Sequence, residues 1–358
     1  MSGNESVDAL RKKIDQIDEK ILELLNDRAS IALTIGHSKR LNNEEIYVPG
    51  REKEILDRLA QLSRGPLSEQ ATRSVFREVI AACRSLESPL KIAFFGVEAS
   101  YSHLAAREKF GATPAFVSTV SIAEVFQEVQ QGRAAYGVVP IENSTEGIVA
   151  HTLDLLVESE LKICAEIFLD IHHHLLSKSG RVEDVRKIVS HPQALAQCRQ
   201  WIARHLRAVE VAEVASTAHA ALMAANDSTL AAISSGLARE IYDLQVIAAS
   251  IEDQSNNITR FLVIGNKDSI PSENDKTSLA FSVKDEPGIL YRMLEPFAKS
   301  GINLSKIESR PIKSKPWEYM FFLDLKGHKE EPRVRGAIQQ LEARSVFLKI
   351  LGSYPSGV

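Results

Sequence analysis

The N-terminal segment, up to residue 88, has the apolar pattern of long helices. Apolar side chains recur at helical spacing from residue 6 to residue 41, with no proline among them. This pattern predicts one helix of about 35 residues, roughly 50 Å long. Two further helices are predicted over 49–63 and 68–86. A small domain is too narrow to bury the first helix, so we expect an all-α bundle whose long helix crosses a dimer interface.

The pattern changes after residue 90 to short apolar runs, each followed by a small polar residue and a helical stretch. This alternation predicts an α/β fold with helices flanking the sheets. Helix N-termini gathered at the carboxyl ends of strands form an anion-binding cleft. No G-x-G-x-x-G follows any of these runs, which argues against a nicotinamide cofactor. The runs are 92–95, 136–140, 187–189, 211–214 and 230–233.

A polar stretch meets a buried strand between residues 251 and 265. Residues 253–257 are all polar, whereas 261–264 are apolar and rich in β-branched side chains. Thr259 and Arg260 lie at the junction, where a loop entering a core strand would place them at the mouth of a cleft. The alternative is an ordinary turn entering a strand.

The C-terminal segment, after a polar linker over 266–276, predicts a small α+β domain. Strands are expected at 277–283, 302–309, 319–325 and 347–351, with helices after 288 and over 334–341. The order β-α-β-β-α-β predicts a ferredoxin-like antiparallel sheet with two helices on one face.

Composition adds mainly exclusions. At 358 residues the chain is too long for one core, so two or three domains are expected. A net charge of −4 gives no reason to expect a nucleic acid partner. No stretch approaches the roughly 20 apolar residues of a membrane span, and no signal-peptide pattern is visible. Cys83, Cys164 and Cys198 are far apart, which favours a reducing cytoplasm.

Three consecutive histidines raise the question of a metal. His172, His173 and His174 lie in an apolar run, 167–176, that we interpret as one strand. His172 and His174 would then share a face. Two ligands without an acidic or histidine partner make a weak site, so we expect no metal.

The cations of the first helix are unusual. Arg28 and Lys39 are eleven residues apart, about three turns, so they share a face that also carries apolar side chains. Arg11 lies roughly 100° away around the helix and cannot join them from the same chain. A partner subunit could supply it.

These cations, with residues of the next two helices, resemble the motif of the all-helical chorismate mutases. The resemblance implies a dimer in which Arg11 completes the other subunit's site. Chorismate is a dianion and its rearrangement is pericyclic, so arginines holding its carboxylates suffice without a nucleophile, metal or cofactor. Val48 stands where relatives often have an Asp, and Glu52 is the alternative ligand for the substrate hydroxyl. The chorismate-binding residues implied are Arg11, Arg28, Lys39, Val48, Arg51, Glu52, Cys83 and Glu87.

Lys39 and Glu87 are the residues implied for catalysis, acting on the ether oxygen that becomes negative. A carboxyl donates a hydrogen bond only when protonated, so Glu87 needs a raised pKa. The mutase activity should therefore fall as pH rises. The alternative is a solvated helical bundle with ordinary surface arginines.

The stretches V-P-I-E-N-S-T-E-G-I-V (139–149) and N-I-T-R-F-L-V-I-G (257–265) resemble the prephenate dehydratases, and 92–103 matches more loosely. The resemblance implies two α/β lobes with the site between them, and activity that depends on Thr259. We interpret Thr259 as a hydrogen-bond donor to the departing hydroxyl, with a proton relayed from Glu142 or His191. Arg260 is expected either to pair with a substrate carboxylate or to be structural. The prephenate-binding residues expected are Ser100, Glu142, Asn143, Ser144, Thr217, Asn257, Thr259, Arg260 and Phe261.

The motifs P-G-I-L and E-S-R-P make the C-terminal segment resemble an ACT regulatory domain of the phenylalanine-binding type. The alternative is a module that only stabilises or dimerises the chain. The effector residues implied are Glu286, Pro287, Gly288, Ile289, Leu290, Glu308, Ser309, Arg310 and Pro311.

The order of segments resembles the bifunctional enzymes of bacterial phenylalanine synthesis over nearly the whole chain. We expect a helical mutase over 1–88, a dehydratase over 90–268 and an ACT domain over 275–358, in a homodimer or larger homo-oligomer inhibited by phenylalanine. The product of the first site would be the substrate of the second. Two alternatives remain: a monofunctional dehydratase with a non-catalytic helical domain, and a non-catalytic amino-acid-binding regulator.

Overall fold

The structure is a computed structural model, and it describes residues 6–42, 49–87, 90–284, 286–311 and 319–357. The chain forms two compact units. The first comprises residues 1–90 with 110–115, and the second comprises 91–109 with 116–358. None of the helices within the described ranges combines the length and apolar content that crossing a membrane requires.

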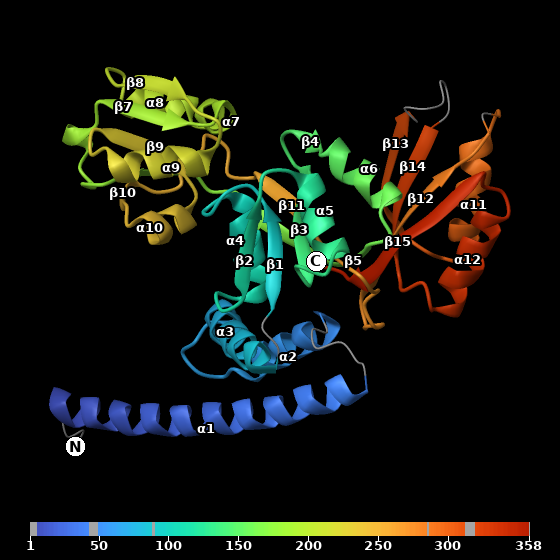
Figure 1. The fold of residues 1–358 in the computed structure, drawn as a ribbon, viewed down its shortest axis with the longest axis horizontal. Helices are drawn as coiled ribbons and strands as arrows, with labels where there is room; N and C mark the ends of the chain where they lie inside the picture. Colours follow the sequence, from blue (N-terminus) through green and yellow to red (C-terminus); the bar gives the residue numbers. More distant parts are fainter. Residues whose placement is uncertain (1–5, 43–48, 88–89, 285, 312–318, 358) are drawn as a thin grey trace. The chain divides into compact units, whose positions relative to one another are not determined.

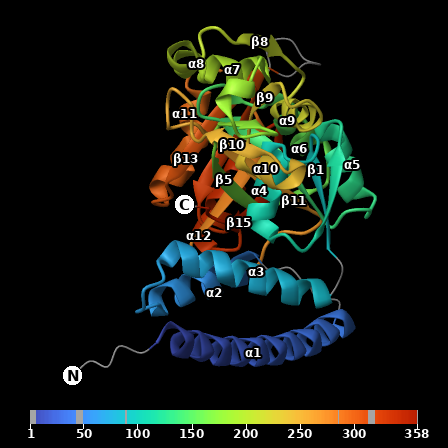
Figure 2. The same ribbon diagram turned by 90° about the vertical axis from the view of Figure 1, so that its left-hand side faces the viewer.

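The first unit is all-helical, as predicted. It contains α1 (Val7–Leu41), α2 (Pro49–Leu62) and α3 (Glu69–Glu87). Ser68 caps α3, its hydroxyl accepting from the amide of Ala71 at 3.1 Å. Both α1 and α2 pack against α3 (Figure 2). The apolar side chains along the N-terminal half of α1 stay 46% to 67% exposed in this chain, among them Leu10, Ile14, Ile17, Ile21 and Leu24.

The second unit begins with an α/β lobe (Figure 1). Its sheet has the order β2-β1-β3-β11-β5, in which β1 and β3 are parallel and β11 is antiparallel to both of its neighbours. The strands are β1 (Lys91–Phe95), β2 (Ala115–Thr119), β3 (Tyr136–Asn143), β5 (Lys162–Asp170) and β11 (Ile258–Gly265), with β4 (Gly147–Ile148) paired to β3; the helices are α4 (Tyr101–Phe110), α5 (Ile122–Gln130) and α6 (Ala150–Glu158).

The second lobe is inserted between β5 and β11. Its sheet has the order β10-β6-β9-β7-β8, and the chain passes between the lobes at 171–173 and 249–257. The amide of Ile251 donates to the carbonyl of His173 at 2.8 Å, so the two crossings are tied together. The elements are β6 (His174–Ser177), η1 (Val182–Asp184), β7 (Lys187–Ser190), α7 (Pro192–Gln197), α8 (Arg199–His205), β8 (Glu210–Glu213), α9 (Thr217–Asn226), β9 (Leu230–Ser234), α10 (Gly236–Tyr242) and β10 (Gln245–Ala248).

The histidine run corrects one prediction. Residues 167–176 are not a single strand, because β5 ends at Asp170 and β6 begins at His174. His172 lies in the crossing between lobes, where its Nδ1 is 2.8 Å from the Glu252 carboxylate. His172 and His174 therefore do not share a strand face. Among the described residues no three His, Cys, Asp or Glu side chains are grouped as metal ligands would be.

The C-terminal domain has the predicted β-α-β-β-α-β order, in an antiparallel sheet β13-β14-β12-β15. One face of the sheet packs on both helices, while the other joins the core of the first lobe through Ala280, Phe322, Leu351 and Tyr354. The first strand begins inside the predicted linker, so Asp275 and Lys276 are buried rather than exposed. The elements are β12 (Asp275–Ser282), α11 (Ile289–Lys299), β13 (Leu304–Pro311), β14 (Tyr319–Lys326), α12 (Pro332–Glu342) and β15 (Phe347–Pro355).

Candidate active sites

A cavity of about 690 Å³ lies between the two α/β lobes. Both lobes contribute polar side chains to its wall, which is otherwise largely apolar. From the first lobe come Ser100, Tyr101, Thr119, Asn143, Thr259 and Phe261, and from the second come His191, Gln197, Ser216 and Thr217; Asn257 and His173 come from the crossings.

Thr259 and Asn143 face each other across the β3–β11 pair. The amide nitrogen of Asn143 donates to the Thr259 hydroxyl at 2.7 Å and to Oδ1 of Asn257 at 2.8 Å. Its own oxygen accepts from the backbone amides of Thr145 at 2.9 Å and Glu146 at 3.0 Å, which fixes the orientation of the side-chain amide. Because Thr259 already accepts a hydrogen bond, its hydroxyl proton remains available to the cavity.

A chain of hydrogen bonds continues from Asn257 into the second lobe. Nδ2 of Asn257 donates to Oε1 of Gln197 at 3.1 Å, and Nε2 of His173 lies 2.7 Å from the same oxygen. Burial lowers the pKa of His173, so its ring is neutral, and Nε2 carries the proton given to Gln197. The Tyr101 hydroxyl donates to the carbonyl of His172 at 2.8 Å and lies 2.8 Å from Nδ1 of His173, and burial raises the pKa of Tyr101 well above its usual value. His173 and Tyr101 are therefore both neutral at the cavity wall.

Helix N-termini also open on the cavity, as predicted. Ser216 caps α9, its hydroxyl accepting from the amide of His219 at 3.0 Å, and Thr217 is the first residue of that helix. Ser100 precedes α4 and accepts from the amide of His103 at 3.3 Å. These termini favour an anionic ligand.

His103 shapes the turn that carries Ser100. Its Nδ1 accepts from the amide of Ala99 at 3.2 Å, and Ala99 has a left-handed φ of 64°. Burial lowers the pKa of His103 to about 4, so the ring stays neutral and able to accept.

Three of the predicted prephenate-binding residues, Glu142, Ser144 and Arg260, are not among the residues that line the cavity. Glu142 and Arg260 are the strand neighbours of Asn143 and Thr259, and successive side chains point to opposite faces. Glu142 pairs with Lys306 at 2.5 Å, so the proposed relay of a proton from Glu142 has no structural basis. Ser144 instead ties the loop to the strand, accepting from the amide of Ile258 at 3.0 Å.

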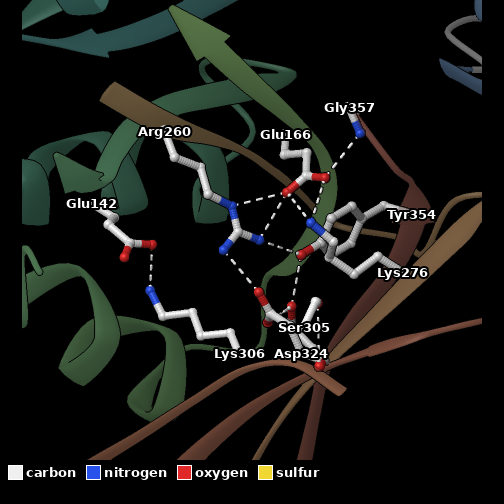
Figure 3. A network of polar contacts seen from close by, with 10 residues as sticks. Glu142, Glu166, Arg260, Lys276, Ser305, Lys306, Asp324, Tyr354 and Gly357 are labelled. Carbon is white, nitrogen blue, oxygen red and sulfur yellow. Dashed lines mark hydrogen bonds and ion pairs between the residues drawn. The ribbon is translucent and has the colours of Figure 1, made fainter. Parts of the chain in front are cut away.

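Arg260 takes the structural alternative (Figure 3). Its guanidinium is buried and donates to Glu166 at 2.9 Å and to Asp324 at 2.8 Å. The cavity is also lined by Tyr101, His173 and Gln197, which the sequence did not predict. Tyr101 lies within the motif 92–103 and His173 within the apolar run 167–176. Nothing in the spacing of Tyr101, His173 and Gln197 indicates that they meet at one cavity.

The first unit holds a second candidate site around Glu87. Burial raises the pKa of Glu87, although the charges of Lys39, Arg84 and Arg28 act to lower it. Gly36 makes this approach possible, because a Cβ on Gly36 would lie 2.8 Å from Cβ of Glu87. Lys39 and Arg28 are thus electrostatically coupled to Glu87, whereas the helical spacing predicted only that the two cations share a face.

Other predicted mutase residues lie elsewhere in the single chain. Arg11 is exposed and pairs with Asp8 at 3.4 Å, and Arg51 pairs with Glu54 at 3.0 Å. Glu52 pairs with Arg84, a buried cation that sequence analysis did not single out and that also donates to the carbonyl of Phe110 at 2.7 Å. Cys83 is buried, and Val48 lies outside the described residues.

The predicted effector stretches lie at the start of α11 and on β13. Gly288 has a φ of 74° and caps α11, and Glu286 pairs with Arg292 at 3.0 Å. On β13, Arg310 pairs with Asp154 of α6 at 2.8 Å. Of the remaining effector residues, Pro287 is exposed beside Gly288; Ile289 and Leu290 pack on the core of the domain; Glu308 is half-buried and Ser309 and Pro311 are exposed on β13.

Comparison with known proteins matches each part to a family. Residues 10–88 match chorismate mutase type II, 92–269 match prephenate dehydratase, and 277–343 match the ACT domain. The helical unit and the two-lobed cavity are therefore those of an enzyme with two catalytic domains and an ACT domain.

Two relatives that match over nearly the whole chain are bifunctional enzymes. A bifunctional chorismate mutase/prephenate dehydratase of Aquifex aeolicus is 48% identical over 99% of both chains, and one of Pseudomonas aeruginosa is 41% identical over 100% of both. A prephenate dehydratase of Arthrobacter aurescens, solved in complex with L-Phe, is 32% identical with a TM-score of 0.69, covering 75% of this chain and 90% of that chain. The chain belongs to the bifunctional chorismate mutase/prephenate dehydratase family, and these matches favour two activities over a monofunctional dehydratase.

Proposed function

We propose that the cavity between the lobes binds prephenate and that Thr259 donates a hydrogen bond to its departing hydroxyl. The observation that carries this proposal is the Asn143–Thr259 contact of 2.7 Å, which leaves the threonine proton directed to the cavity. The carboxylate of the substrate leaves as carbon dioxide, and its electron pair aromatises the ring as the C–O bond breaks. Aromatisation drives the reaction, so the site has only to hold the dianion and stabilise the hydroxide.

The helix N-termini at Ser100 and at Ser216–Thr217 hold the substrate carboxylates, with Phe261 and other apolar residues against the ring. Asn257 and the neutral chain through Gln197, His173 and Tyr101 keep the two lobes in register around the substrate. Water or His191 supplies the proton that turns hydroxide into water.

For the mutase, we propose a dimer in which α1 is shared. The exposed apolar stripe of α1 supports this arrangement, because such a surface is normally covered. Lys39 and a protonated Glu87 then act on the ether oxygen of chorismate, and Arg28 with Arg11 of the partner subunit holds the carboxylates. Arg51, Glu52 and Cys83 stay proposed substrate contacts, although Glu52 has Arg84 as a competing partner.

We further propose that phenylalanine inhibits the enzyme by binding to residues 286–290 and 308–311. The proposed domains are the mutase over 1–88, the dehydratase over 90–268 and the ACT domain over 275–358. A relative solved with L-Phe supports the choice of effector. A cytoplasmic location is supported by the three cysteines, none of which forms a disulfide. No metal or other cofactor is proposed for either reaction.

The test gives purified protein chorismate and follows prephenate and phenylpyruvate separately, with and without phenylalanine. Successive appearance of both products, suppressed by phenylalanine, is the expected result. Accumulation of prephenate without phenylpyruvate would contradict the proposed role of Thr259 but would still support the mutase activity. If prephenate is converted but chorismate is not consumed, the helical unit has no catalytic role and serves only for dimerisation.

A further inference from the structure

The dehydratase lobe and the ACT domain are joined by buried charges. Arg260 on β11 contacts Glu166 on β5 and Asp324 on β14, and Nζ of Lys276 on β12 lies 2.7 Å from Glu166 (Figure 3). Arg260 also donates to the hydroxyl of the fully buried Tyr354 at 3.0 Å. Two cations face two carboxylates, so the cluster is balanced. Removing one partner would leave a buried charge uncompensated, which makes these contacts strong positional constraints.

A second link joins β3, the strand paired with β11, to the ACT domain. Glu142 on β3 and Lys306 on β13 form an ion pair of 2.5 Å in which the lysine side chain is 17% exposed and the carboxylate 38% (Figure 3). This pair lies toward the edge of the interface, whereas Arg260 lies deep inside it.

The two links share one geometric property. Across the β3–β11 ladder, Thr259 is paired with Asn143, and Arg260 is paired with Glu142. Thr259 and Asn143 face the cavity, and their strand neighbours face the ACT domain. Two consecutive cross-strand pairs therefore connect the opposite faces of one sheet. A shift of Glu142 or Arg260 moves the backbone that carries Asn143 or Thr259.

The strand β13 contains the predicted effector residues 308–311 and also contacts the dehydratase lobe. Side chains alternate along β13, so Lys306, Glu308 and Arg310 share a face. Lys306 contacts Glu142, and Arg310 contacts Asp154 on α6, whose N-cap Val149 lines the cavity. Glu308 lies between them within the predicted effector stretch.

We propose that Glu142 and Arg260 are positioning residues, by which the ACT domain holds Asn143 and Thr259 at the dehydratase cavity, and that the Glu142–Lys306 pair transmits effector occupancy of β13 to that cavity. This inference rests on the proposed function and specifies how its regulation works. Neither residue lines the cavity. Their effect is on the orientation of the two side chains that do, so it falls on kcat for prephenate rather than on mutase turnover.

The test uses the full-length protein and the variants Glu142→Gln, Lys306→Met and the double variant. The pair is partly exposed, so these changes leave no deeply buried charge and the chain should fold. Lys329→Met is the matched control, because Lys329 joins the ACT domain to Asp268 and neither residue adjoins a cavity side chain. Each protein is assayed for kcat and KM with prephenate, for chorismate consumption, and for inhibition and binding of phenylalanine.

Glu142→Gln and Lys306→Met should each lower dehydratase kcat about 10- to 100-fold, the range that follows a small misplacement of catalytic groups. The double variant should be no worse than either single change. Inhibition by phenylalanine should weaken although phenylalanine still binds, and the reversed pair Glu142→Lys with Lys306→Glu should recover part of kcat. The control and the mutase activity should match wild type.

Wild-type kcat in both single variants, or an equal loss in Lys329→Met, would overturn the proposal. Multiplicative losses in the double variant would do the same, because independent effects show that the pair is not the link. A wild-type protein that does not convert prephenate would contradict the proposed function itself, before any variant is compared.

Discussion

The side-chain amide of Asn143 donates to the hydroxyl of Thr259 at 2.7 Å, and two backbone amides hold the Asn143 oxygen in place. This contact assigns the direction of the hydrogen bond, since Asn143 can only be the donor. The threonine proton must therefore be directed elsewhere, and the cavity is the open direction.

Replacing Thr259 should separate the two activities. Thr259→Val keeps the shape but removes the donor, so dehydratase kcat should fall about 10²- to 10⁴-fold, the usual contribution of a positioned proton donor. Thr259→Ser restores the hydroxyl and should retain most of the activity. Mutase turnover, measured on the same samples, should be unchanged; equal activity of the valine and serine variants would contradict the role.

The mutase should lose activity as pH rises, because burial raises the pKa of Glu87 and the protonated form is the hydrogen-bond donor. Raising the pH removes that proton, so kcat/KM for chorismate should decline on the alkaline side. Glu87→Gln donates at every pH and should flatten the profile. An unchanged slope in the glutamine variant would assign the titration to another group.

Gly36 should be needed for the mutase and not for the dehydratase. A Cβ at this position would lie 2.8 Å from two carbons of Glu87, so Gly36→Ala must displace that side chain or separate α1 from α3. We expect a loss of about 1–3 kcal/mol in stability of the helical unit, with reduced chorismate turnover. Gly65→Ala is the control, since nothing lies within 4 Å of its Cβ. Thermal unfolding and both activities measure the difference.

Acid should destabilise the dehydratase lobe through His103. Its pKa is lowered from an ordinary value of 6.5 to about 4 in the folded protein. The unfolded chain therefore binds the proton more readily, so this contribution to stability is full above pH 6.5 and is lost as pH falls toward 4. His103→Asn should remove that part of the pH dependence in urea unfolding, whereas the exposed His151→Asn should not. If the free energy of unfolding depends on pH in the same way in both variants, His103 is not the source of the acid destabilisation.

Charge in the apolar stripe of α1 should dissociate the proposed dimer. Ile14 and Ile17 are 57% and 54% exposed in one chain, and Ile14→Asp would bury a carboxylate at a shared interface. Light scattering should report a smaller assembly, together with loss of mutase activity and retained dehydratase activity. Lys20→Glu changes charge on the same helix outside that stripe, and it should leave the mass unchanged.

The sequence predicts structure well where the signal lies in neighbouring residues. Helical spacing, short apolar runs and capping serines predicted most of the helices and strands, although β2, α5, α8 and β10 were not predicted, and the polar-to-apolar junction placed Thr259 at a cavity. Prediction failed where the outcome depended on what packs behind a strand. Arg260 and Thr259 are both polar, so the sequence does not tell which side chain faces away from the cavity. The partners of Arg260, Glu166 and Asp324, decide this. The same holds for Lys276, which looked like part of a linker but is a buried partner of Glu166.

The close packing of β15 against β5 limits how the ACT domain can be exchanged between enzymes. A Cβ on Gly352 would come within 2.3 Å of the Ile163 carbonyl oxygen, and the ACT sheet shares a core with the dehydratase lobe. The ACT domain is therefore not an independently exchangeable module. Exchange with the ACT domain of another enzyme would succeed only if the donor supplied the acceptors of Arg260, a lysine for Glu142 and a glycine at this seam. A substitution on one side of this contact therefore limits which residues are tolerated on the other.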